Sequence, residues 1–172
     1  AYIDRCVQLH NDRTGEQPDV IAVFMGTNDY SYYQSTLGTA EIDYAALITD
    51  RGDGTFDYAK PATTCEAYAI MLHKMTQRYP DAEIYCLGML SRRDPDHDGR
   101  EVVPPPTSFN AELKAIVERF GGTYVDVESF IPATASEFDR YMSDRRVHPN
   151  AAGMDKITEA VVETMLQRQG TL

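Results

Sequence analysis

The sequence lacks any apolar run long enough to cross a bilayer, and it carries little positive charge. A membrane-spanning helix needs about 18 to 20 consecutive apolar residues, and no stretch of the 172 residues reaches that length. Sixteen basic residues stand against 27 acidic ones, which leaves a net charge of −11. Because a chain of that sign repels phosphate backbones and anionic lipid, nucleic acid and membrane surfaces are poor partners.

Cysteine is also scarce, and no two cysteines are close in sequence. Cys6, Cys65 and Cys86 form no Cys-x-x-Cys pair, so we expect neither a zinc site nor a disulfide framework. No motif indicates a cofactor. The chain begins at Ala1 with neither an initiator methionine nor a recognisable signal peptide, as a processed or shortened chain would, and its localisation is therefore not predicted.

What the sequence does contain is an alternation of strand and helix patterns. Apolar runs at residues 20–25, 83–90 and 123–127 are typical of buried strands. Residues 3–9 look like the tail of a helix. Three further stretches place apolar side chains on one face of a helix, at Tyr68, Met71, Leu72, Met75 and Tyr79; at Phe109, Leu113, Ile116, Val117 and Phe120; and at Met154, Ile157, Val161, Met165 and Leu166. The alternation predicts a single α/β domain over residues 1–172, with a parallel sheet.

Two irregular stretches, residues 29–61 and 91–106, each follow a predicted strand. They therefore lie at the carboxyl edge of the sheet, where open α/β folds place their ligands. The first begins at Gly26-Thr27-Asn28-Asp29, where a glycine lets the backbone turn and an Asn amide can donate to a developing oxyanion. A plain turn explains the same residues, because Asn and Asp favour turns.

A second motif, His148-Pro149-Asn150, precedes the last predicted helix, which Asn150 is placed to cap. A histidine at such a junction with Asp144 nearby has the parts of a general base and its orienting acid. An exposed loop histidine before a capped helix is the plainer interpretation.

The two motifs together, in this order and at this spacing, resemble the SGNH hydrolase family, also called GDSL esterases and lipases. The resemblance implies a three-layer, flavodoxin-like parallel sheet with helices on both faces, and a serine ester hydrolase. It implies that Asn28 donates to the oxyanion, that Gly26 shapes the turn presenting it, that His148 is the general base and that Asp144 orients His148.

The sequence departs from the family pattern at two places. The acid usually stands three residues before the histidine, where this chain has Arg145, so Asp144 lies one residue further away. Asp126 is a weaker candidate for the acid. The family's nucleophile lies in a Gly-Asp-Ser-like block far upstream of the Gly-x-Asn-Asp motif, and the 25 residues before Gly26 contain no serine.

We therefore expect an N-terminally incomplete domain that lacks the serine block and its strands and is inert toward esters by itself. Ser31, Ser35 and Ser91 do not stand at a strand–turn–helix elbow and are poor substitutes. The predicted substrate is a small-molecule or carbohydrate ester; a non-catalytic binding or structural module with the same fold remains the alternative. An uncovered sheet edge favours a homodimer.

Two smaller signals stay open. Tyr30 and Tyr32 follow the Gly-x-Asn-Asp turn and are candidates for the wall of a substrate cleft, or else they cover the sheet edge. Residues 94–99 alternate Asp oxygens as a calcium loop does, but the twelfth position is Pro105 and the bidentate Glu of an EF-hand is absent. We expect a solvated acidic loop and no metal.

Overall fold

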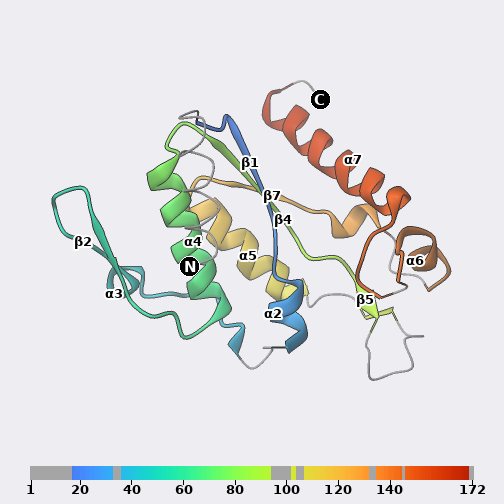
Figure 1. The fold of residues 1–172 in the computed structure, drawn as a ribbon, viewed down its shortest axis with the longest axis horizontal. Helices are drawn as coiled ribbons and strands as arrows, with labels where there is room; N and C mark the ends of the chain where they lie inside the picture. The colour runs from blue at the N-terminus through green and yellow to red at the C-terminus, as the bar shows by residue number, and fades with distance from the viewer. Residues whose placement is uncertain are drawn as a thin grey trace.

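The computed structural model describes residues 17–32, 36–93, 102–103, 107–131, 135–144 and 146–170. Its centre is a parallel sheet of three strands in the order β1 (Val20–Phe24), β4 (Glu83–Leu87), β7 (Thr123–Val125) (Figure 1). The register pairs Val23 with Cys86 and Cys86 with Tyr124. The predicted residues 88–90 and 126–127 extend beyond the strands, as connections at the carboxyl edge.

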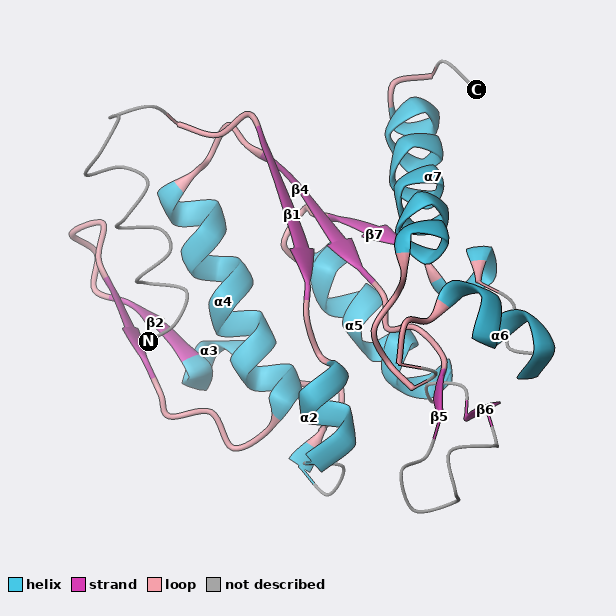
Figure 2. Cartoon of the chain, turned by 45° about the vertical axis from the view of Figure 1, so that its right-hand side comes forward, coloured by secondary structure: helices cyan, strands magenta, loops and turns pink. Residues whose placement is uncertain are grey.

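Helices cover both faces of this sheet (Figure 2). On one face, α4 (Thr64–Arg78) and α5 (Thr107–Arg119) pack in a core with Ile84 and Cys86 of β4. On the other face, α6 (Ala135–Tyr141) and α7 (Ala151–Arg168) pack on Tyr85 and Leu87. Since side chains alternate along a strand, β4 is buried on both faces. The predicted class, α/β with a parallel sheet between two helix layers, is confirmed.

The helices form where the apolar periodicity predicts them. In α4 a capping box of Thr63 and Glu66 satisfies the first free N–H groups, and the helix ends before Pro80. Gly121, with φ 74°, follows α5. One predicted position is wrong: Met154 in α7 is 49% exposed, whereas Ile157 is buried in the core.

The stretch after β1 is more ordered than its sequence indicates. It contains α2 (Thr27–Tyr32), α3 (Tyr44–Leu47) and an antiparallel hairpin of β2 (Ile48–Asp50) and β3 (Phe56–Tyr58). The hairpin packs on α4 through His73, whose ring meets Phe56 at 4.5 Å between centroids. A second short hairpin joins β5 (Arg92–Arg93) to β6 (Val102–Val103), and η2 (Glu128–Phe130) follows β7.

β1 is less covered than expected for a strand at the centre of such a fold. Val23 is buried, but Val20 and Phe24 are each 44% exposed, and β1 is an edge strand among the described residues. The predicted helix tail at residues 3–9 and the acidic loop at 94–99 lie outside the described residues. No helix in the described ranges is long and apolar enough to span a bilayer.

Candidate active site

The first functional segment is the turn between β1 and α2. Gly26 has φ 118°, a conformation that side chains rarely tolerate, and a Cβ there would lie 3.3 Å from the Met89 sulfur. Its carbonyl accepts a hydrogen bond of 2.8 Å from the backbone N–H of Tyr30, which closes the first turn of α2. This turn leaves the Asn28 side chain exposed at the carboxyl edge of the sheet.

The second segment is the loop between α6 and α7, which carries His148. An antiparallel bridge between Met142 and Pro149 closes its neck, and the backbone N–H of Ser143 donates to the His148 carbonyl at 2.7 Å. The Asn150 amide donates to the Arg140 carbonyl at 2.8 Å and its oxygen caps α7 at the Gly153 N–H. The loop is thus fixed at both ends.

Gly153 is needed where these two helices meet. A Cβ at this position would stand 2.3 Å from the Tyr141 carbonyl oxygen, which is backbone and cannot move aside cheaply. The close approach lets α7 start directly behind the His148 loop, so the glycine helps to define where the histidine stands.

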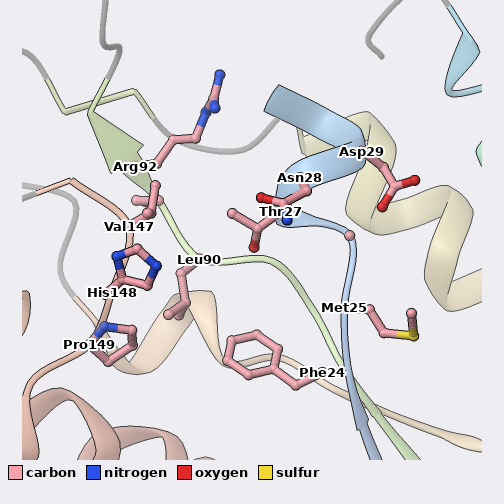
Figure 3. A pocket seen from close by; sticks show the side chains of 12 residues that line it. Phe24, Met25, Thr27, Asn28, Asp29, Leu90, Arg92, Val147, His148 and Pro149 are labelled. Atoms are coloured by element: carbon pink, nitrogen blue, oxygen red, sulfur yellow. The ribbon is translucent and has the colours of Figure 1, made fainter. Parts of the chain in front are cut away.

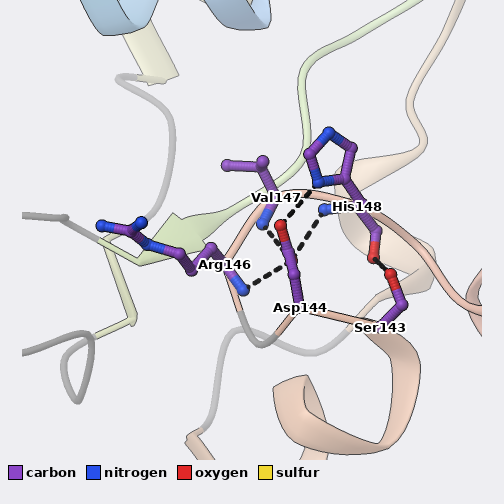
Figure 4. A network of polar contacts seen from close by, with 5 residues as sticks. All are labelled: Ser143, Asp144, Arg146, Val147 and His148. Atoms are coloured by element: carbon purple, nitrogen blue, oxygen red, sulfur yellow. Dashed lines mark hydrogen bonds and ion pairs between the residues drawn. The ribbon is translucent and has the colours of Figure 1, made fainter.

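Asp144 holds the loop from the inside (Figure 4). Its Oδ1 accepts the backbone N–H groups of Arg146 at 2.8 Å, Val147 at 2.9 Å and His148 at 3.1 Å. Its Oδ2 lies 2.5 Å from His148 Nδ1. Both carboxylate oxygens are therefore used, one for the loop backbone and one for the ring.

These contacts fix the charge of the Asp144 carboxyl. Desolvation acts to raise its pKa, but the N–H groups of His148, Arg146 and Val147 and the His148 ring outweigh desolvation and hold the pKa well below its usual range. The carboxylate is thus ionised and can only accept, so Nδ1 is the ring nitrogen that donates to it. This contact favours the tautomer whose lone pair is on Nε2. The His148 side chain is 75% exposed, so Nε2 is accessible.

His148 and Asn28 line the same cavity, which has a volume of about 420 Å³ (Figure 3). That volume is in the usual range of ligand sites. Its wall comes from the end of β1 and the start of α2, from the connection between β4 and β5, and from the His148 loop. The lining residues are Phe24, Met25, Gly26, Thr27, Asn28, Asp29, Leu90, Ser91, Arg92, Val147, His148 and Pro149. The structure thus brings Gly26, Asn28 and His148 to one cavity, with Asp144 behind the histidine.

The segment after β4 forms the back of this cavity. The buried amide of Asn110 on α5 accepts from the Met89 N–H at 3.0 Å and donates to the Met89 carbonyl at 3.2 Å. The same amide donates to Glu128 at 3.1 Å, and burial, the largest influence there, raises the pKa of the Glu128 carboxyl. Asn110 therefore fixes the chain from which Ser91 and Arg92 project.

The remaining predicted residues lie elsewhere. Tyr30 is 8% exposed, belongs to the core and is not among the residues that line the cavity; the side chain of Tyr32 is outside the described part. Asp126 accepts from the Ser129 N–H at 3.3 Å at the start of η2. Ser91 lines the cavity, but its Oγ is buried, and its side chain acts on the Glu128 carboxyl, where it opposes the rise in pKa.

Two residues in and behind the cavity, Arg92 and Asn110, were not predicted from the sequence. Arg92 stands in a charged stretch, where its inward orientation has no sequence signal. Asn110 is a polar residue on the apolar face of a predicted helix, beside Phe109 and Leu113. A polar side chain at such a position could have been recognised from the sequence as one with buried hydrogen-bond partners. Within the described ranges, no group of three or more His, Cys, Asp or Glu side chains could hold a metal ion.

Several solved structures are similar to the chain in fold. The chain superposes on a GDSL-like lipase from Parabacteroides merdae with a TM-score of 0.60 and 20% identity, over 94% of this chain and 67% of that one. A peptidoglycan O-acetylesterase matches with a TM-score of 0.64 and 14% identity, over 98% and 42%. An acetylxylan esterase from Geobacillus stearothermophilus matches with 0.52 and 15%, over 94% and 66%. At these identities, the likeness shows the SGNH hydrolase fold.

The sequence itself identifies the family. The GDSL-like Lipase/Acylhydrolase family matches residues 4–156, so the chain belongs to that family of ester hydrolases. The resemblance seen in the two motifs is thereby confirmed. Among curated proteins, no sequence matches the chain significantly.

Proposed function

We propose that this chain carries the base, the acid and the oxyanion donor of a serine ester hydrolase, and that a segment outside residues 1–172 supplies the serine. The Asp144–His148 pair carries the proposal. Its 2.5 Å contact orients Nδ1 toward the carboxylate, and the ring faces the cavity that Asn28 lines. A histidine used only as a loop residue would need no such carboxylate.

In the proposed first step, His148 Nε2 takes the proton of the serine hydroxyl while the serine oxygen bonds to the ester carbonyl carbon. The carbonyl electron pair moves to its oxygen, and the Asn28 amide N–H donates to that oxyanion. Asp144 stabilises the imidazolium that forms. When the carbon–oxygen bond to the alcohol breaks, the same proton passes from Nε2 to the departing alkoxide.

A water molecule then attacks the acyl-enzyme through the same two proton transfers. His148 takes a proton from the water as the water oxygen attacks the acyl carbon. It returns the proton to the serine oxygen as the bond between the acyl carbon and that oxygen breaks.

Small esters suit the cavity volume. Two proteins of similar structure are a peptidoglycan O-acetylesterase and an acetylxylan esterase. Their names support O-acetyl sugars and short-chain esters as the first substrates to test.

The additional residue between Asp144 and His148 is compatible with this role. Because Asp144 accepts three successive backbone N–H groups, the loop curls around the carboxylate and returns the histidine ring to it. With Asp144 four positions before His148, the loop therefore allows the same carboxylate–imidazole contact that the family usually makes with an acid three positions before the histidine.

Fluorophosphonate labelling of the protein expressed from its full natural reading frame tests the proposal. We expect a label on a serine upstream of residue 1, located by peptide mass spectrometry, and its loss in His148→Ala. His73→Ala, which changes a histidine far from the cavity, should keep the label. A folded wild-type protein without any label would refute the proposal.

One observation favours a second function, a non-catalytic binding module. The one serine that lines the cavity among the described residues, Ser91, has a buried Oγ and no hydrogen bond to His148. A module of this kind would bind an ester or sugar in the cavity without cleaving it. Absence of label together with saturable ligand binding would favour this alternative.

A further inference from the structure

A second, smaller cavity lies behind the turn that presents Asn28. It has a volume of about 140 Å³. Helices α4 and α5 supply most of its wall, with the side chains of Ala67, Tyr68, Met71, Phe109 and Leu113. All of these except Ala67 are buried in the core. An apolar space of this size stays dry and accepts an apolar group, since a cavity of about 150 Å³ lined by apolar side chains holds benzene.

The smaller cavity adjoins the candidate active site. Met25, Gly26 and Asp29 line both cavities, so the turn between β1 and α2 separates the two. The side chains of Met25 and Asp29 extend from this turn away from His148 (Figure 3). The smaller cavity therefore lies on the side of the turn opposite the proposed general base.

The boundary between the two cavities suits an uncharged carbon chain. Gly26 has no side chain there, and Met25 is 40% exposed and unbranched, so its side chain adapts to a neighbouring group at low cost. Asp29 places a carboxylate at the same boundary, and like charges repel. A neutral chain is therefore favoured over an anionic one.

The geometry of ester cleavage directs the acyl chain of a substrate toward the smaller cavity. The carbonyl carbon of an ester carries the carbonyl oxygen, the alcohol oxygen and the acyl chain. In the proposed reaction Asn28 binds the carbonyl oxygen, and the alcohol oxygen lies within hydrogen-bond reach of His148 Nε2, from which it receives its proton. The acyl chain then extends away from His148, to the side of the turn where the smaller cavity lies.

We propose that the smaller cavity is an acyl subsite, and that the preferred substrates carry an uncharged acyl chain of about four to six carbons, the length that a benzene-sized space accepts. Ala67 is then a specificity-determining residue, because a larger side chain at this position of the wall would occupy the space that the chain needs. The inference rests on the proposed function for the reaction, whereas binding of the chain requires no serine.

Binding of three matched amides tests the inference without any chemistry. Calorimetry on the protein from its full natural reading frame compares N-phenylacetamide, N-phenylbutanamide and N-phenyloctanamide, which differ only in the acyl chain. Each CH₂ group that leaves water for an apolar site strengthens binding about fourfold. We therefore expect the butanamide to bind about fifteenfold more tightly than the acetamide.

The octanamide measures where the cavity ends. Its four further CH₂ groups would strengthen binding about 250-fold relative to the butanamide if all of them were buried. We expect a gain of at most about fifteenfold, because a chain beyond about six carbons no longer fits. A gain near 250-fold would indicate an open groove and would overturn the assignment.

Variants assign the preference for the butanamide to this cavity. Ala67→Leu fills the cavity and should reduce the preference over the acetamide to less than about threefold. Met71→Ala enlarges the cavity and should strengthen binding of the octanamide relative to the butanamide. Ala111→Leu makes the matched addition at an exposed position of α5 and should keep the wild-type preference. Circular dichroism checks that each variant is folded; if Ala67→Leu is not, Ala67→Val and Met71→Ala decide.

The outcomes separate the two proposals. Equal binding of acetamide and butanamide by the wild type, or an unchanged preference in folded Ala67→Leu, would overturn the acyl subsite even if an upstream serine is labelled. A preference that is lost in Ala67→Leu supports the subsite even in a protein without label. For an active enzyme, we expect kcat/KM for 4-nitrophenyl butanoate to exceed that for the acetate about fifteenfold, and Ala67→Leu to remove this ratio.

Discussion

At the scale of the residue, one carboxylate organises the candidate site. Asp144 joins three backbone N–H groups and the His148 ring, and its low pKa keeps it charged at any pH where an esterase would work. Because the folded pKa lies below the unfolded value of about 3.9, its stabilising contribution is present above that pH and is lost as the pH falls below it.

Replacing Asp144 therefore affects the base more than the fold. We expect Asp144→Asn to lower kcat by two or more orders of magnitude, since the amide cannot both accept from the backbone and stabilise an imidazolium. Asp126→Asn, the matched change at the other candidate acid, should alter kcat less than about threefold. Steady-state kinetics on a chromogenic ester compares the two, and equal losses would contradict the assignment.

Sequence could place Asn28 and His148 but not the whole site. Their motifs depend on local features, a glycine turn after a strand and a capped helix after a histidine, and the structure brings both to one cavity. Arg92 and Tyr30 depend on contacts between distant segments. Nothing in the sequence around Arg92 indicates that this arginine is buried. Tyr30 packs on Phe109 of α5, a helix that begins 77 residues later.

At the scale of the element, the hairpin of β2 and β3 depends on one helix. Tyr58 Oη lies 3.0 Å from His73 Nδ1 on α4, and the ring also meets Phe56 and Phe120. Strands of three residues are too short for periodicity to predict, and the contacts that attach the hairpin to α4 join segments distant in sequence. The helices α4 and α5 were predictable because their apolar stripes extend over three or more turns.

Acid should weaken this hairpin before it affects the sheet. Burial lowers the pKa of His73, so below the unfolded value of about 6.5 the unfolded chain binds a proton that the folded one resists. We expect the free energy of unfolding to fall between pH 7.5 and 5.5 more in the wild type than in His73→Gln. Urea titrations at both pH values measure this, and identical pH dependence would contradict it.

At the scale of the whole molecule, the two faces of the sheet are covered unequally. Residues of β4 are buried on both sides, whereas Val20 and Phe24 of the edge strand β1 remain exposed. Met154 and Val162 of α7 are exposed as well. An apolar strand edge of this kind pairs readily with another strand. The cavity lies at the carboxyl end of β1. A second strand that pairs with β1 would therefore also border the cavity.

We therefore expect residues 1–172, expressed alone, to form a homodimer or larger assemblies through β1. Phe24→Lys should shift the sedimentation of the chain toward monomer at tens of micromolar, because a charge on that face opposes close packing. Thr49→Lys makes the same change of charge on the exposed hairpin and should have no effect. A monodisperse wild-type monomer at that concentration would refute this expectation.

The His148 loop also has a consequence for the order of folding. Among its described residues, the hydrogen bonds that shape it, from the Arg140 carbonyl to the Asn150 amide, join residues no more than ten positions apart. Contacts so local lose little chain entropy and form early, whereas the sheet must first join β1 to β4 across 63 positions. The acid–base pair is thus a self-contained unit, able to form before the strands that will face it.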